Sequence, residues 1–145
     1  MKSSDCSKVL IRELKNREGY RKNLKDVELT MTEVWNNLVG VKGVRFDTVR
    51  VIPPESEINE AKHEMRDRWN DLVKERERIL LQLRHIDDIL KSVDGEIRET
   101  IEMVYCAKEE DRKTFEYMGR QFHISGAGLW YRVQNALENY CIRTH

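Results

Sequence analysis

Apolar residues recur along the first third of the chain at alternating spacings of three and four. The repeat is clearest in Leu24, Val27, Met31, Val34 and Leu38. This spacing places the apolar side chains in one stripe along a helix, as in the seam of a coiled coil. It predicts a helix from about Lys8 to Val39, with Gly19 as a point where that helix is loosened or kinked.

A second, longer repeat fills the middle of the chain. Apolar residues recur every seven positions, at Ile58, Met65, Leu72, Ile79, Ile86 and Val93. The pattern predicts a helix from about Glu55 to Val93, a rod of roughly 55–60 Å at a rise of about 1.5 Å per residue. The first helix carries a matching but shorter stripe, so an antiparallel hairpin is the simplest way to bury both. The unmatched remainder of the longer stripe is expected to pack on the C-terminal region or on a second chain.

Turn-forming residues divide the chain. Gly40, Gly43 and the pair Pro53-Pro54 predict a hairpin loop over residues 40–54, and Gly95 ends the second long helix. We therefore expect an all-α protein with two domains. The first is a helical hairpin over residues 1–94, and the second is a C-terminal module over residues 95–145.

Shorter helical segments make up the C-terminal module. The residues from Glu96 to about Ala107 carry apolar side chains on one helical face. Thr114 is a candidate N-cap for a short helix that ends near Phe122, and Ser125 is a candidate N-cap for a last helix. A short helix, a turn of about four residues and a second helix have the anatomy of a helix-turn-helix, so we expect this motif here.

Residues around the predicted turn fit that motif. Gly119 lets the two helices cross closely, while Ile124 and Leu129 fill the angle between them. Ser125 satisfies free N–H groups at the start of the last helix, where a phosphate also has room to approach. Exposed residues on the first turns of that helix would face a major groove of DNA. The candidate DNA-binding residues are Thr114, Ser125, Gly126, Ala127, Trp130, Tyr131, Arg132, Gln134 and Asn135.

The tryptophans and Tyr131 have different expected roles. Trp35 and Trp69 are interpreted as packing at or beside the hairpin seam. Trp130 and Tyr131 each have two interpretations, as exposed aromatics that contact thymine methyl groups or sugars, or as core residues that pack against the hairpin. We expect one of the two to take each role.

These residues also carry a resemblance to known proteins. The segments Tyr117–Gly119 and Phe122–Ser125, followed by Leu129 and the pair Ala136-Leu137, resemble the C-terminal helix-turn-helix of bacterial sigma factors, their fourth conserved region. In its order of parts the chain resembles small phage transcriptional regulators of the RinA/ArpU-like kind. The loop element Gly43–Asp47 matches the Gly-x-x-aromatic-Asp element of that group. The resemblance implies sequence-specific binding of duplex DNA and regulation of phage or prophage genes.

Charge is unevenly spread along the chain. The net charge is zero, but residues 1–25 hold eight Lys and Arg against three Asp and Glu, and residues 93–145 hold seven against nine. A slightly acidic module is unfavourable for DNA binding, which gains much of its free energy from phosphate neutralisation. Three alternatives stay open: the basic N-terminal segment supplies phosphate contacts, a dimer gains avidity, or binding is weak. The basic segment is equally interpreted as a solvated helix face.

Other chemistry is sparse in the sequence. The odd, scattered set Cys6, Cys106 and Cys141 predicts reduced thiols and no disulfide framework. Metal-ligand spacings, a Gly-rich phosphate loop and a G-x-S-x-G motif are missing, so we expect no metal, no cofactor and no enzymatic activity. No apolar run reaches the length of a membrane helix, which favours a cytoplasmic protein without a membrane partner.

Two hypotheses for the function follow. The leading one is a sequence-specific transcriptional regulator that binds double-stranded DNA, with RNA polymerase or another protein as a further partner left open. The alternative is a coiled-coil interaction or assembly protein whose helix-turn-helix module docks a protein partner rather than DNA. A homodimer through the helical hairpin is compatible with both.

Overall fold

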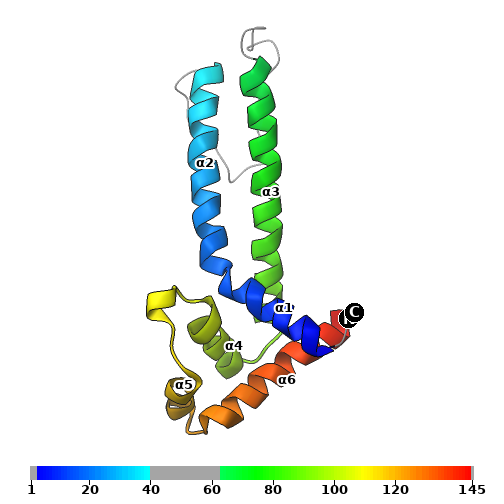
Figure 1. The fold of residues 1–145 in the computed structure, drawn as a ribbon, viewed down its shortest axis with the longest axis vertical. Helices are drawn as coiled ribbons and strands as arrows, with labels where there is room; N and C mark the ends of the chain where they lie inside the picture. The colour runs from blue at the N-terminus through cyan, green and yellow to red at the C-terminus, as the bar shows by residue number, and fades with distance from the viewer. Residues whose placement is uncertain (1–2, 40–62, 145) are drawn as a thin grey trace. The chain divides into compact units, whose positions relative to one another are not determined.

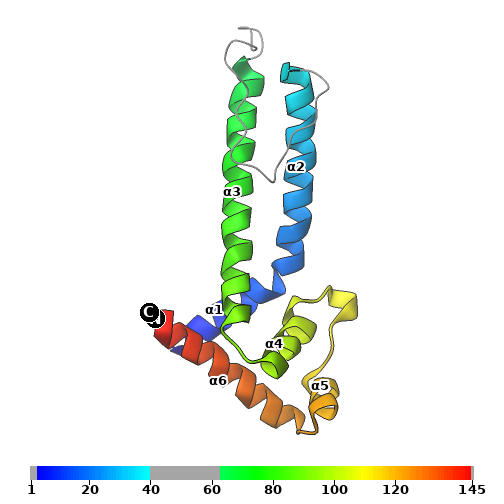
Figure 2. The same ribbon diagram turned by 180° about the vertical axis from the view of Figure 1, so that it is seen from behind.

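The computed structural model describes residues 3–39 and 63–144, and their regular structure is entirely helical (Figures 1 and 2). The elements are α1 (Ser3–Lys15), α2 (Arg17–Val39), α3 (His63–Lys91), α4 (Gly95–Ile101), the π-helical segment η3 (Glu102–Cys106), the 3-10 turn η4 (Glu109–Asp111), α5 (Phe115–Phe122) and α6 (Gly126–Thr144). The all-α prediction is confirmed for these residues. The predicted loop over 40–54 and the start of the second repeat lie outside the described residues. No described helix combines the length and the apolar character that a membrane crossing needs.

The helices gather into two compact units. The first contains α1, the start of α2 through Tyr20, the end of α3 from Gln82 onward, and all later elements. The second contains the rest of α2 and the first part of α3. This division differs from the predicted boundary at residue 94, because the ends of both long helices belong to the same unit as α4, α5 and α6.

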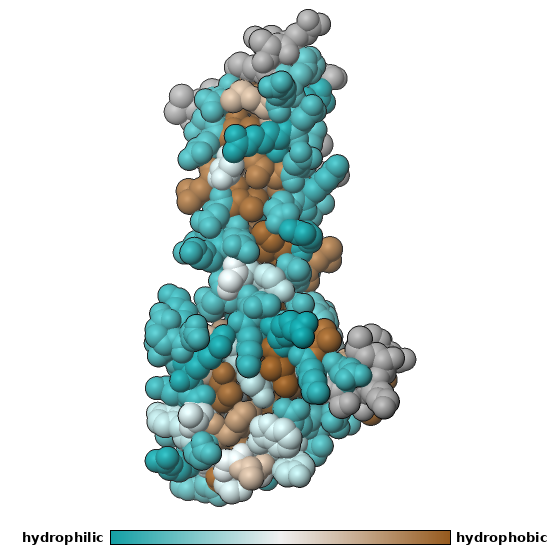
Figure 3. Space-filling view, viewed as in Figure 1, coloured by the Kyte–Doolittle hydropathy of each residue, from teal (hydrophilic) through white to brown (hydrophobic). Residues whose placement is uncertain are grey.

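The second unit is an antiparallel pair of helices built on the predicted stripes. The rings of Trp35 and Trp69 lie 5.2 Å apart between centroids, and the Arg76 Nε lies 3.4 Å from the Glu28 Oε1. Because the later residue of α2 meets the earlier residue of α3, the helices run in opposite directions. The buried side chains of this unit are Met31, Val34, Leu38, Trp69 and Val73. The expected packing of the two tryptophans at the seam is confirmed, and apolar side chains show between polar ones on the face of this unit seen in Figure 3.

The first unit has the larger core. Each of α1, α3, η3 and α6 contributes side chains to it, and the buried ones are Cys6, Leu10, Leu14, Ile86, Ile89, Leu90, Val93, Ile101, Tyr105, Cys106, Val133, Leu137 and Cys141. Burying an aliphatic side chain of this size contributes about 1.5–3 kcal/mol, so this cluster is the main source of the unit's stability. The expectation that the unmatched end of the second stripe packs on the C-terminal region is confirmed by Ile86–Val93.

The first predicted helix is interrupted. It begins at Ser3 and is divided at Asn16 into α1 and α2, close to the kink expected at Gly19. Hydrogen bonding continues through the interruption, because the Asn16 N–H donates to the Arg12 carbonyl at 3.2 Å and the Tyr20 N–H donates to the Asn16 carbonyl at 2.9 Å. The interruption therefore falls three residues before Gly19, within the first unit.

The side chain of Arg98 caps the C-terminal end of α3. The Arg98 Nε donates to the Leu90 carbonyl at 2.7 Å, and its Nη2 donates to the Val93 carbonyl at 3.1 Å. Carbonyls in the last turn of a helix have no partner within the helix, so a guanidinium is a suitable donor for them. This contact fixes the connection between α3 and α4, which forms one wall of the groove described below.

Candidate nucleic-acid interface

Side-chain caps define the two helices of the predicted motif. The Tyr117 N–H donates to the Thr114 Oγ1 at 3.1 Å at the start of α5, and the Gly128 N–H donates to the Ser125 Oγ at 3.0 Å at the start of α6. Both predicted N-caps are therefore present. The turn between the helices is short, from His123 to Ser125. Figure 1 shows α5 nearly end-on while α6 runs across the view, so the two helices cross.

The turn is packed tightly against α5. A Cβ atom on Gly119 would lie 2.5 Å from the Ile124 carbonyl oxygen, which leaves room for glycine alone. His123 adopts the left-handed conformation with φ of 60°, and the Ile124 N–H donates to the Gly119 carbonyl at 2.9 Å. The expected close crossing at Gly119 is confirmed. Leu129 is fully buried behind the turn and Ile124 is half-buried.

Two aromatic side chains lie on the outer side of α6. Trp130 is 43% exposed and Tyr131 is 64% exposed, and their rings meet edge to face with centroids 5.2 Å apart. Ala127, one turn earlier, is also exposed. The expectation that one of the two aromatics packs in the core is wrong, because Leu129 and Val133 occupy the buried face of the helix.

Cations surround this part of the chain. Between residues 113 and 137 the charged side chains are Lys113, Glu116, Arg120 and Arg132, and all four are exposed. The Lys113 Nζ lies 5.0 Å from the centre of the Tyr117 ring. Three consecutive exposed carboxylates of the C-terminal module instead form η4, Glu109–Asp111. The slight net negative charge of the module therefore does not extend to α5 and the first half of α6.

Several predicted site residues serve the fold instead. Gln134 is half-buried and hydrogen-bonds to the Tyr105 hydroxyl; burial raises the pKa of Tyr105, and this hydrogen bond opposes the rise. A Cβ on Gly126 would lie 3.1 Å from the Glu116 backbone nitrogen, so this glycine permits close packing. Thr114 and Ser125 use their hydroxyls as caps. Among the nine predicted residues, Ala127, Trp130, Tyr131, Arg132 and Asn135 are exposed without a capping role, and the exposed Thr114 and Ser125 also cap helices.

A groove of about 670 Å³ runs between α6 and the connection from α3 to α4. Arg132 and Asn135 line it, so these two predicted residues face a different neighbourhood from Trp130. Its other lining residues include Asp94, Glu96, Ile97, Asn139, Ile142 and Arg143. The sequence prediction stopped at Asn135 and missed the last three of these. Asn139 follows Asn135 by four residues, and Ile142 and Arg143 follow Asn139 by three and four, a spacing that places them on one face of the helix.

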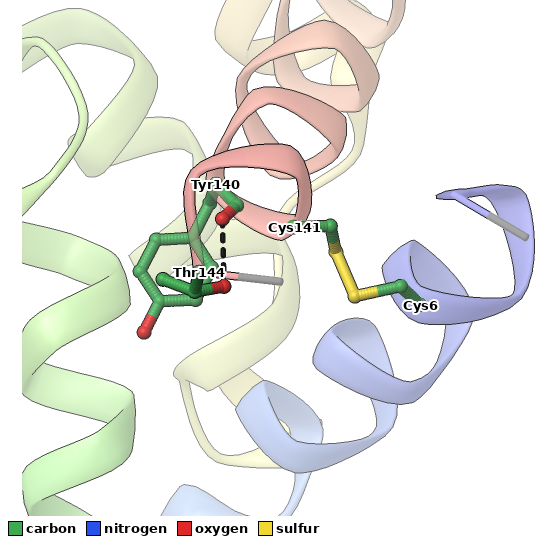
Figure 4. The surroundings of a disulfide bond; sticks show 4 residues. All are labelled: Cys6, Tyr140, Cys141 and Thr144. Carbon is green, nitrogen blue, oxygen red and sulfur yellow. Dashed lines mark hydrogen bonds between the residues drawn. A yellow bond between two sulfur atoms is a disulfide. The ribbon is translucent and has the colours of Figure 1, made fainter. Parts of the chain in front are cut away.

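A disulfide bond joins the two ends of the first unit. Cys6 of α1 and Cys141 of α6 are bonded, with their Cα atoms 6.2 Å apart (Figure 4). The prediction of three reduced thiols is therefore wrong for this pair. The cysteines are 135 residues apart, and only the packing of α1 along α6 brings them together. Cys106 is outside the disulfide and its thiol is buried in the same core.

Neither metal chemistry nor similarity to known proteins adds to this site. Within residues 3–39 and 63–144, no three His, Cys, Asp or Glu side chains gather in a group that could hold a metal ion. Comparison with protein-family models, curated proteins and solved structures gives no match. The geometry of α5, α6 and their surroundings is thus the basis for assigning a function.

Proposed function

We propose that this chain is a sequence-specific DNA-binding transcriptional regulator, of the phage or prophage kind, and that the first turns of α6 enter the major groove. The observation that carries this proposal is the capped, glycine-packed turn between α5 and α6, which leaves Ala127, Trp130 and Tyr131 exposed on the outer side of a long helix. A major groove about 12 Å wide admits one α-helix.

The chemistry of the exposed residues supports duplex DNA as the partner. Aromatic and methyl side chains pack against thymine methyl groups and sugars, which suits Trp130, Tyr131 and Ala127. The exposed cations Lys113 and Arg120 would neutralise phosphates beside the groove, which favours binding through counterion release. Asp94 and Glu96 line the groove beside Arg132, so the duplex would approach from the Trp130 side.

Selection from random-sequence duplex DNA tests the proposal. Immobilised protein is expected to enrich a defined sequence from a pool of random duplexes. Trp130→Ala and Tyr131→Ala are each expected to lower the affinity for that sequence about tenfold or more, a loss of about 1.4 kcal/mol or more. Leu29→Ala is the matched control, because Leu29 is a large exposed apolar residue on α2. A pool that stays random after repeated rounds would contradict the proposal.

The second candidate function is an interaction or assembly protein, and the groove beside α6 favours it. The groove presents cations (Arg132, Arg143) and carboxylates (Asp94, Glu96) around the apolar side chain of Ile142, which is 67% exposed. A peptide with charges of both signs and an apolar face complements such a lining. In this case a protein partner would bind wild-type protein and lose affinity with Ile142→Asp, whereas Trp130→Ala would leave binding unchanged.

The remaining expectations belong to the same proposal. We propose that the protein acts in the cytoplasm, without catalysis and as a homodimer through α2 and α3, with RNA polymerase or another protein as a further partner. In the cytoplasm most thiols are kept reduced, so the bond between Cys6 and Cys141 would then depend on the redox conditions that the protein meets.

A further inference from the structure

The two halves of α1 are attached to the first unit very differently. Among residues 5–9, only Cys6 and Ser7 are buried, while the remaining three, Val9 among them at 39%, are exposed. The disulfide to Cys141 is the covalent attachment of this half. In both ribbon views the first turns of α1 lie beside the last turns of α6 (Figures 1 and 2).

The second half of α1 is held by several non-covalent contacts. Leu10 and Leu14 are buried in the core of the first unit. The Arg112 Nη2 donates to the Lys15 carbonyl at 3.1 Å, and the Tyr20 hydroxyl donates to the Glu13 Oε2 at 3.0 Å. This half therefore has its own means of staying docked when the disulfide is open.

We propose that the Cys6–Cys141 disulfide is a redox-controlled attachment of the first two turns of α1 to the end of α6. In the oxidised protein these turns are docked on the end of α6. A dithiol reductant opens the bond, and the segment 3–9 then loosens while the rest of the first unit keeps its fold. This inference goes beyond the proposed function, because it concerns only the attachment of α1 and does not depend on what α6 binds.

The reaction is a balanced thiol–disulfide exchange. A thiolate of the reductant attacks one protein sulfur, the bond between the two cysteines breaks, and the departing cysteine thiolate takes a proton. The second thiol of the reductant then attacks the mixed disulfide and releases the other cysteine, so the protein gains two electrons and two protons and the reductant becomes a disulfide. Cys6 and Cys141 are only 6% and 3% exposed, so attack requires the start of α1 to open first.

Hydrogen exchange measured by mass spectrometry on the full chain tests whether the attachment of α1 depends on the disulfide. Air-oxidised protein, unfolded in denaturant, is expected to show one titratable thiol, because one disulfide engages two of the three cysteines. Treatment with dithiothreitol is expected to speed exchange in segment 3–9 by about tenfold or more, and to change residues 10–20 by less than about twofold, as for local opening of a helix end.

Two variants sharpen this test. Cys141→Ser is expected to exchange like the reduced wild type without any reductant, and Cys106→Ala is expected to respond to dithiothreitol like the wild type. Three titratable thiols in the air-oxidised protein would overturn the proposal, as would equal exchange of residues 3–9 in the oxidised and reduced wild type. The comparison of the two wild-type forms decides the question even if a variant fails to fold.

Discussion

Single residues at the turn between α5 and α6 determine how closely the two helices approach. Gly119 has the Ile124 carbonyl where a Cβ would be, and His123 occupies a left-handed conformation that costs most side chains about 1–2 kcal/mol. The turn therefore depends on the absence of a side chain at Gly119 and on the left-handed backbone conformation at His123. Both features bear directly on the direction in which α6 leaves the turn.

Replacing Gly119 by alanine tests the first of these features. We expect Gly119→Ala to lower the free energy of unfolding by about 1–3 kcal/mol, because the backbone carbonyl of Ile124 must move to make room. Urea unfolding followed by circular dichroism measures the loss. Gly19→Ala is the control, because its Cβ would meet no atom within 4 Å, and it should be neutral or stabilising by up to about 1 kcal/mol. Equal destabilisation by both changes would show that the close approach is not what matters.

Residue-level predictions from sequence succeeded where the cause was local. Thr114, Gly119 and Ser125 act on backbone atoms within five residues of themselves, so their roles follow from residue type and spacing. The hydrogen bond of Gln134 to Tyr105 and the disulfide of Cys141 to Cys6 do not follow from local spacing, because the partners are distant in sequence. No periodicity indicates such pairs.

At the scale of elements, α6 combines two tasks on opposite faces. Its residues Leu129, Val133 and Leu137 hold it in the core, which leaves Trp130 and Tyr131 on the outside. The helix begins at a defined residue, because Ser125 caps its first turn. Stable capping is therefore a condition for presenting the aromatic pair in a defined orientation.

Removing the caps tests this dependence. Thr114→Ala and Ser125→Ala are each expected to cost about 1 kcal/mol of stability, the usual contribution of a hydroxyl N-cap. Thr30→Ala is a matched control, because the Thr30 hydroxyl donates within α2 to the Asp26 carbonyl and caps nothing; its effect should stay within about 0.5 kcal/mol. Thermal denaturation of the three variants under identical conditions makes the comparison. If Thr114→Ala and Ser125→Ala destabilise the protein no more than Thr30→Ala does, the role given to the two caps is contradicted.

Hydrophobic periodicity predicted most of the helices but not the residue at which the first of them is interrupted. The seven-residue repeat extends beyond the partner stripe, and Ile86–Val93 accordingly pack with the C-terminal helices. The interruption at Asn16 lies three residues before the kink expected at Gly19. No proline or glycine stands at Asn16 itself, and the backbone hydrogen bonds continue through it.

At the scale of the whole molecule, the first unit is assembled from both ends of the chain. Leu10 and Leu14 from the beginning pack with Val133 and Leu137 from the end, and the disulfide between Cys6 and Cys141 spans 135 residues. A prediction made segment by segment divides such a unit, because it assigns α1 to the hairpin that follows it. The boundary expected at residue 94 reflects that limitation.

Removing the disulfide tests how much this long-range link contributes. Cys6→Ala combined with Cys141→Ala is expected to lower the free energy of unfolding by about 2–5 kcal/mol relative to the oxidised wild type, because the unfolded chain is no longer constrained across so long a loop. Denaturant titrations with and without dithiothreitol provide the measurement. The wild type should lose stability with the reductant while the double variant should not change. A wild-type midpoint that is insensitive to dithiothreitol would contradict this account.

The central claim, that α6 reads duplex DNA with support from nearby cations, is tested most directly by the salt dependence of binding. Fluorescence anisotropy of a labelled duplex carrying the selected sequence gives the binding constant at each salt concentration. We predict a linear fall of log K with log salt for the wild type, and a slope smaller in magnitude by about 1 for Arg120→Ala. Binding that is independent of salt, or no binding even at low salt, would contradict the claim.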